Sequence, residues 1–142
     1  MSDTLPMLRR GVLAVLSLGL TGVGVELLLI QHYEDPWQLV PLVLVAVSLA
    51  VIVWHAVGRS RASVQGLQAA MLLCLAGGLA GVALHFRGAA EFQLEIDPSM
   101  KGTALVRKVM RAKAPPVLAP GVMVQLGLLG LVYAHRWSYR HE

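Results

Sequence analysis

Four unbroken apolar runs, separated by polar segments, dominate the sequence. They cover residues 11–30, 37–54, 67–86 and 117–134. A helix of about 20 residues crosses the hydrocarbon core of a bilayer, where the backbone must satisfy its own hydrogen bonds. None of the runs shows the alternation of barrel strands. The pattern predicts an all-α integral membrane protein in which residues 1–142 form one domain, a bundle of four transmembrane helices.

The composition supports a membrane protein and excludes several other classes. Hydrophobic residues make up 56% of the chain and charged residues 14%, with a mean hydropathy of +0.66. Average soluble domains carry about 25% charged residues, so this chain is too apolar for a small soluble monomer. A single cysteine excludes a disulfide scaffold. The net charge of +4 reflects bases that flank the apolar runs, so it does not indicate a nucleic-acid partner.

The distribution of basic residues predicts the orientation in the membrane. Cytoplasmic segments are enriched in Lys and Arg, and the first connection, residues 31–36, contains neither. This places both termini and the second connection in the cytoplasm, because these segments carry Arg9 with Arg10, Arg59 with Arg61, and Arg136 with Arg140. The third connection, residues 87–116, opposes this orientation because it holds six basic residues. The side that this connection faces therefore stays open.

The third connection carries its own structural signals. Residues 91–96 alternate polar and apolar side chains, which predicts a short strand or an extended lip, and Asp97-Pro98 is typical of a turn or a helix start. Residues 103–114 form an amphipathic pattern, which predicts a helix at the membrane surface. Its charged side carries Arg107, Lys108, Arg111 and Lys113. This segment is either a solvated tether or a docking element for lipid or a partner subunit.

Small residues at helical spacing indicate where the spans pack. The third run contains a GxxxG pair, Gly77 and Gly81, and the fourth contains Gly127 and Gly130. Small residues let helix backbones approach closely in lipid. We expect these faces to meet within one bundle, with a face that binds helices of another protein as the alternative. Cys74, alone in the middle of a run, is interpreted as a small packing residue.

The polar residues in and near the spans are the candidates for chemistry. Glu26 is the one acid within a run, and His85 lies near the same predicted end of the bundle, so the two are candidates for an intramembrane contact. The histidines suggest haem b as an alternative cofactor, because neutral imidazole is a common axial ligand. The pairs would be His32 with His85 and His55 with His135. The acids near His32 match no metal-binding spacing, and no catalytic motif is present, so no cofactor is expected.

Two segments resemble a known group of proteins. The stretch His32-Tyr33-Glu34-Asp35-Pro36-Trp37-Gln38-Leu39-Val40-Pro41 is similar to segments of small, uncharacterised bacterial four-helix inner-membrane proteins. So is the stretch Ala119-Pro120-Gly121-Val122-Met123-Val124-Gln125-Leu126-Gly127. The resemblance implies the inner membrane of a bacterium and brings no activity with it.

These observations favour a non-catalytic accessory or assembly subunit of a larger bacterial membrane complex. Its partners would be the lipid bilayer and other membrane subunits. The reason is the shortage of polar groups inside the spans, since transporters and pumps line a path with several of them. Two alternatives stay open. One is a small redox or quinone-linked protein that binds haem through its histidines, and the other is an ion or proton carrier that uses Glu26.

Overall fold

The computed structural model describes residues 4–113 and 115–135, and it is all-α over this part of the chain. The helices are α1 (Thr4–Leu29), α2 (Pro36–Gly58), α3 (Arg61–Ile96), α4 (Gly102–Met110) and α5 (Leu118–Ala134). Within the described residues, α1, α2 and α3 are long and apolar enough to cross a membrane, and α5 is a shorter apolar helix of 17 residues. Arg136 and Arg140, which contribute to the predicted orientation, lie outside the described residues.

Local sequence signals set the starts of α2 and α3. The Asp35 carboxylate accepts a hydrogen bond from the Trp37 backbone N–H at 3.0 Å, and Pro36 occupies the first turn. The side chain of Gln38 accepts a bond from the Asp35 backbone N–H, which completes a capping box. Ser60 caps α3 in the same reciprocal way with Ser63. These caps satisfy backbone donors that an apolar helix start otherwise leaves unpaired.

The helices α3 and α5 pack with their backbones in close contact. A Cβ atom added to Gly127 would lie 2.8 Å from the backbone nitrogen of Leu75, and one added to Gly78 would lie 2.8 Å from that of Val124. The GxxxG pair divides between two neighbours, because Gly77 faces Leu44 of α2 whereas Gly81 faces Pro120 at the start of α5. Glycines allow this approach because no side chain separates the helices.

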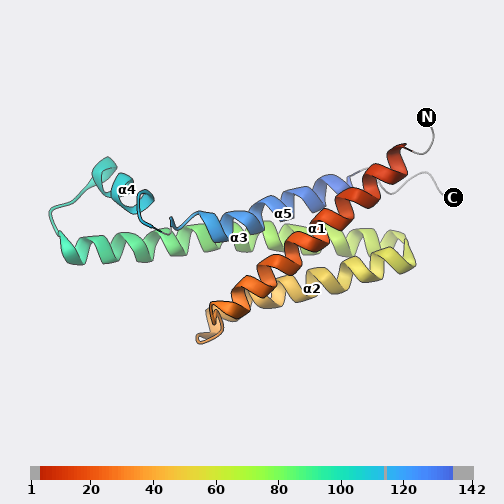
Figure 1. The fold of residues 1–142 in the computed structure, drawn as a ribbon, viewed down its shortest axis with the longest axis horizontal. Coiled ribbons are helices and arrows are strands. Elements are labelled where there is room, and N and C mark those ends of the chain that lie inside the picture. The colour runs from red at the N-terminus through yellow and green to blue at the C-terminus, as the bar shows by residue number, and fades with distance from the viewer. Residues whose placement is uncertain (1–3, 114, 136–142) are drawn as a thin grey trace.

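The helix α1 crosses the bundle obliquely (Figure 1). It meets α5 near its middle, where a Cβ on Gly19 would lie 2.6 Å from a methyl group of Leu126, and where Leu16 lies beside Gly130. The core beneath this crossing contains Leu16, Leu20, Leu67, Met71 and Cys74, all fully buried. Because α1 and α5 diverge on either side of the crossing, a hollow opens between them at each end.

The helix α3 extends well beyond the rest of the bundle (Figure 1). The rings of His32 and His85 stack with centroids 6.2 Å apart, so the α1–α2 turn lies level with residue 85 of α3. The residues from Phe86 to Ile96 continue as helix for about 16 Å past this point. The part of α3 between Ser63 and His85 is about 33 Å long, which is close to the thickness of a bilayer core.

The prediction of a strand or an extended lip at residues 91–96 was wrong, because these residues are the last turns of α3. Six alternating residues are too few to outweigh a helix that already runs into them. Ala89 and Ala90 favour helix. Arg87 forms an ion pair with Glu91 one turn on, at 2.7 Å. The first proline that could stop the helix is Pro98.

Of the two alternatives predicted at Asp97-Pro98, the structure shows the turn and not a helix start. Asp97 is the C-cap of α3, and its carboxylate accepts hydrogen bonds from the backbone and side chain of Ser99. The next helix begins at Gly102, whose φ of +56° suits glycine, and ends at Met110 instead of continuing to residue 114. It folds back against α3 and buries Val109.

Candidate functional site

A buried polar cluster joins three helices at the end of the bundle where α2 turns into α3. The ring of His55, 1% exposed, lies between Ser63 of α3 and Tyr133 of α5. Its Nδ1 atom is 3.0 Å from the Ser63 hydroxyl oxygen, and its Nε2 atom is 3.0 Å from the Tyr133 hydroxyl oxygen. The positive charges of Arg9 and Arg59 lie near Tyr133.

The hydrogen bonds of this cluster have a defined direction. The Ser63 hydroxyl donates to the backbone carbonyl of Ser60 at 2.8 Å, so its oxygen serves as acceptor toward the His55 ring. Nδ1 of His55 therefore carries a proton, and in the neutral ring Nε2 accepts from the Tyr133 hydroxyl. The chain of bonds runs from Tyr133 through His55 and Ser63 to Ser60, the N-cap of α3, and so ties α5 to the α2–α3 turn.

This geometry bears directly on haem ligation by His55. Both of its ring nitrogens are engaged in hydrogen bonds. An iron atom could bind to the ring only if one of these two hydrogen bonds were broken. His135, its suggested partner, is exposed at the end of α5. The arrangement is that of a structural polar cluster linking helices. The buried ring holds three segments together at one end of the bundle.

At the opposite end, the structure brings His32 together with His85 and not with an acid. The two rings lie nearly parallel, at 25°. Partial burial lowers the pKa of His32, and the neighbouring His85 lowers it further. A neutral His32 avoids placing a second positive charge beside the ring of His85.

Glu26 points elsewhere, into the hollow between the last turns of α1 and the first turns of α5. This hollow has a volume of about 520 Å³. Its polar lining comes from Glu26, Lys113 and Gln125, and its apolar lining includes Leu118, Gly121 and Val122. Glu26 and Gln125 are both exposed on their helices. In the described part of the chain no ion pair joins Glu26 to His85, and Glu26 lines this hollow together with Lys113.

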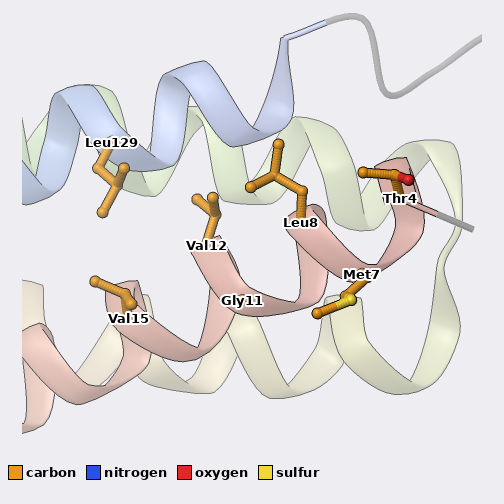
Figure 2. Close-up of a pocket in the computed structure, with 7 residues that line it drawn as sticks. All are labelled: Thr4, Met7, Leu8, Gly11, Val12, Val15 and Leu129. Atoms are coloured by element: carbon orange, nitrogen blue, oxygen red, sulfur yellow. The ribbon is translucent and has the colours of Figure 1, made fainter.

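The hollow at the other end of α1 is almost entirely apolar (Figure 2). It measures about 450 Å³ and lies between Leu8, Val12 and Val15 of α1 and Leu129 of α5. Thr4, at the start of α1, contributes the one polar side chain of its lining. Such a surface suits lipid acyl chains and offers no group for chemistry.

The remaining candidates lie at the surface. Arg107, Lys108, Arg111 and Lys113 are all exposed, the first two on α4 and the others in the segment after it. Within residues 4–113 and 115–135, no three His, Cys, Asp or Glu side chains come close enough to share a metal ion. The acids near His32 are therefore not gathered into a metal site in this part of the chain.

Two members of the buried cluster were missed by the sequence analysis. Ser63 carries only the signal of a helix-capping serine, three residues after Ser60. Tyr133 has the position of an aromatic residue at a membrane interface, a common feature of spanning helices. Because Tyr133 is 78 residues from His55 in the chain, no local pattern links them.

Comparisons with known protein families, with curated proteins and with solved structures give no match to this chain.

Proposed function

We propose that this chain is a four-span, non-catalytic subunit of a bacterial inner-membrane complex and that it binds another subunit through α1. The observation that carries this proposal is the outward face of α1. Leu18, Gly22 and Val25 follow one another on this face, and all are exposed. Gly11, also exposed, lies at the start of this face, where it borders the apolar hollow between α1 and α5. A Cβ atom added to Gly11 or Gly22 would meet nothing within 4 Å.

Four central glycines on α3 and α5 behave differently, although Gly88 of α3 and Gly121 of α5 are as open as those of α1. A Cβ on Gly77, Gly78, Gly81 or Gly127 would come within 2.9 Å of a neighbouring helix, so each of these glycines serves a contact inside the bundle. Contact with lipid tails gains nothing from a small residue, whereas small residues let the backbone of a second helix approach closely. The open glycines of α1 thus favour a partner helix on this face.

The polar groups within the bundle support a role without chemistry. In the described residues, every buried side-chain nitrogen and oxygen has a hydrogen-bond partner. Ser48 pairs with Cys74 at 3.2 Å, and Ser17 bonds the backbone carbonyl of Leu13. Polar groups that serve a transport path instead line a cavity or a water-filled channel.

The arrangement of the helices supports four crossings. The helix α5 is about 25 Å long, from its rise per residue. It runs beside α3, and the side chain of Gln68 bonds the Ala134 carbonyl at its far end. The start of α1, the end of α5 and the α2–α3 turn share one end of the bundle (Figure 1). We assign this end to the cytoplasm because Arg9, Arg10, Arg59 and Arg61 lie there.

The test is to extract the chain in a mild detergent from the membranes in which it is made and to measure the mass and composition of the particle. We expect a particle much heavier than a few copies of 15.3 kDa, with fixed companions. Gly22→Leu should reduce the recovery of those companions about tenfold or more, because the new side chain fills the open face of α1.

The matched control is Ala76→Leu, which enlarges a small exposed residue on α3 to a similar degree. This variant should keep the companions. A particle that contains only this chain would contradict the proposal, and so would an equal loss of companions in both variants.

A further inference from the structure

The hollow that contains Glu26 brings two opposite charges to one lipid-facing space. Glu26 lies one turn before the end of α1 at Leu29. Lys113 enters the same space from the segment that joins α4 to α5. Although both residues are described, they do not form an ion pair with each other. The charges face a shared volume without neutralising each other directly.

A charge at this depth is costly unless a group of opposite sign approaches it. A ligand that carries both a cation and an anion would neutralise Glu26 and Lys113 together. We propose that this hollow binds the headgroup of phosphatidylethanolamine, with its ammonium on Glu26 and its phosphate on Lys113.

The remaining lining fits the rest of such a lipid. Leu118 and Val122 form apolar walls on α5, along which acyl chains can lie. The volume of about 520 Å³ exceeds that of a single ion or a water molecule and accommodates a headgroup. Gly121 also lines the hollow and leaves open space there, because a Cβ atom at this position would meet nothing within 4 Å.

The structure also distinguishes between headgroups. A primary ammonium has N–H donors for the Glu26 carboxylate and for the side-chain oxygen of Gln125, whereas the methylated nitrogen of choline has none. Phosphatidylglycerol supplies the phosphate for Lys113 but no cation for Glu26. The site therefore selects an amine-bearing lipid over both. The lipid site rests on the membrane location in the proposed function, but it does not depend on a partner at the outward face of α1.

The test uses the purified full chain in detergent with equal amounts of phosphatidylethanolamine, phosphatidylcholine and phosphatidylglycerol, and counts the lipids retained by native mass spectrometry. We expect retention of phosphatidylethanolamine about tenfold above phosphatidylcholine, as for one or two charge-assisted hydrogen bonds. Glu26→Gln should bring the two to similar levels, and Lys113→Gln should lower retention of all three. Glycerophosphoethanolamine, which lacks acyl chains, should not displace the bound lipid.

The matched controls are Glu91→Gln and Lys108→Gln, which make the same charge changes at exposed positions outside the hollow. Both should keep the preference for phosphatidylethanolamine. Equal retention of the three lipids by the unmodified chain would overturn the proposal. So would a preference that survives Glu26→Gln, or one that Glu91→Gln removes equally. Circular dichroism and the thermal midpoint should show that Glu26→Gln, at an exposed position, leaves the fold intact.

Discussion

His55 shows how one residue organises an end of this bundle. A histidine at the end of an apolar helix usually reaches for the headgroup region. Here the neighbouring helices cover it, and both ring nitrogens bond to side chains from α3 and α5. The ring lies edge-on to Tyr133, with centroids 5.7 Å apart, so packing and hydrogen bonding act on the same pair. The pair therefore couples the end of α5 to the end of α2.

Removing the Tyr133 hydroxyl should loosen this coupling. We expect Tyr133→Phe to lower the free energy of unfolding by about 1 kcal/mol, because a buried hydrogen bond to the His55 ring is lost while the aromatic packing remains. Thermal or denaturant unfolding in detergent would measure the change. Tyr33→Phe, at an exposed position in the α1–α2 turn, is the control and should have almost no effect. Equal stability of the two variants would show that the cluster contributes little.

At the scale of elements, the pair α3 and α5 depends on glycines that face backbone rather than side chains. At Gly77 the nearest atom to an added Cβ is the end of a leucine side chain, which can move aside. At Gly127 the nearest atoms belong to the backbone of residues 71 and 75, which cannot move without separating the helices. The two glycines therefore differ in how much a methyl group disturbs the packing.

Gly127→Ala should consequently destabilise the purified protein by about 1–3 kcal/mol, as expected for an overpacked contact. Gly22→Ala is the matched control, since the added methyl group meets open space there. It should be neutral or stabilise by about 0.5–1 kcal/mol, because alanine favours helix over glycine. Unfolding in detergent measures both. If Gly127→Ala were as stable as Gly22→Ala, the close packing of α3 on α5 would be refuted.

At the scale of the whole molecule, the length of α5 matters most. This helix has 17 residues. Such a length is at the lower limit for crossing a bilayer, and it succeeds only where the membrane thins or neighbouring helices support its ends. In this protein α3 accompanies α5 along its length, and the Gln68 bond to Ala134 holds its last turn. These contacts make a fourth crossing compatible with the short helix.

Accessibility of single cysteines in intact cells tests this topology. Cys74 is fully buried, so the unmodified chain should not react with a membrane-impermeant maleimide. Ser99→Cys should react from outside, whereas Ala62→Cys and His135→Cys should react only after the membrane is permeabilised. If the Ser99→Cys and His135→Cys variants were labelled from the same side, α5 would not cross the membrane. If the Ser99→Cys and Ala62→Cys variants were labelled from the same side, a crossing by α3 would be refuted.

Local chemistry in the sequence determined which segments form apolar helices and where two of them begin. In a bilayer, long apolar runs leave the backbone no hydrogen-bond partner except itself, so helices at residues 11–30, 37–54 and 67–86 follow directly. Asp35 with Pro36 marks the start of α2 for a reason contained within a single helical turn. These features require no knowledge of distant neighbours.

Tertiary structure decided what these helices contact. The continuation of α3 through residues 91–96 reflects the cooperativity of an existing helix, which a short alternating pattern does not record. The partners of His55 come from α3 and α5, and the split of Gly77 and Gly81 between α2 and α5 depends on how three helices cross. Glu26 shares a hollow with Lys113 because α1 diverges from α5. Contacts between residues far apart in the chain are set by packing, and periodicity along one segment carries no information about them.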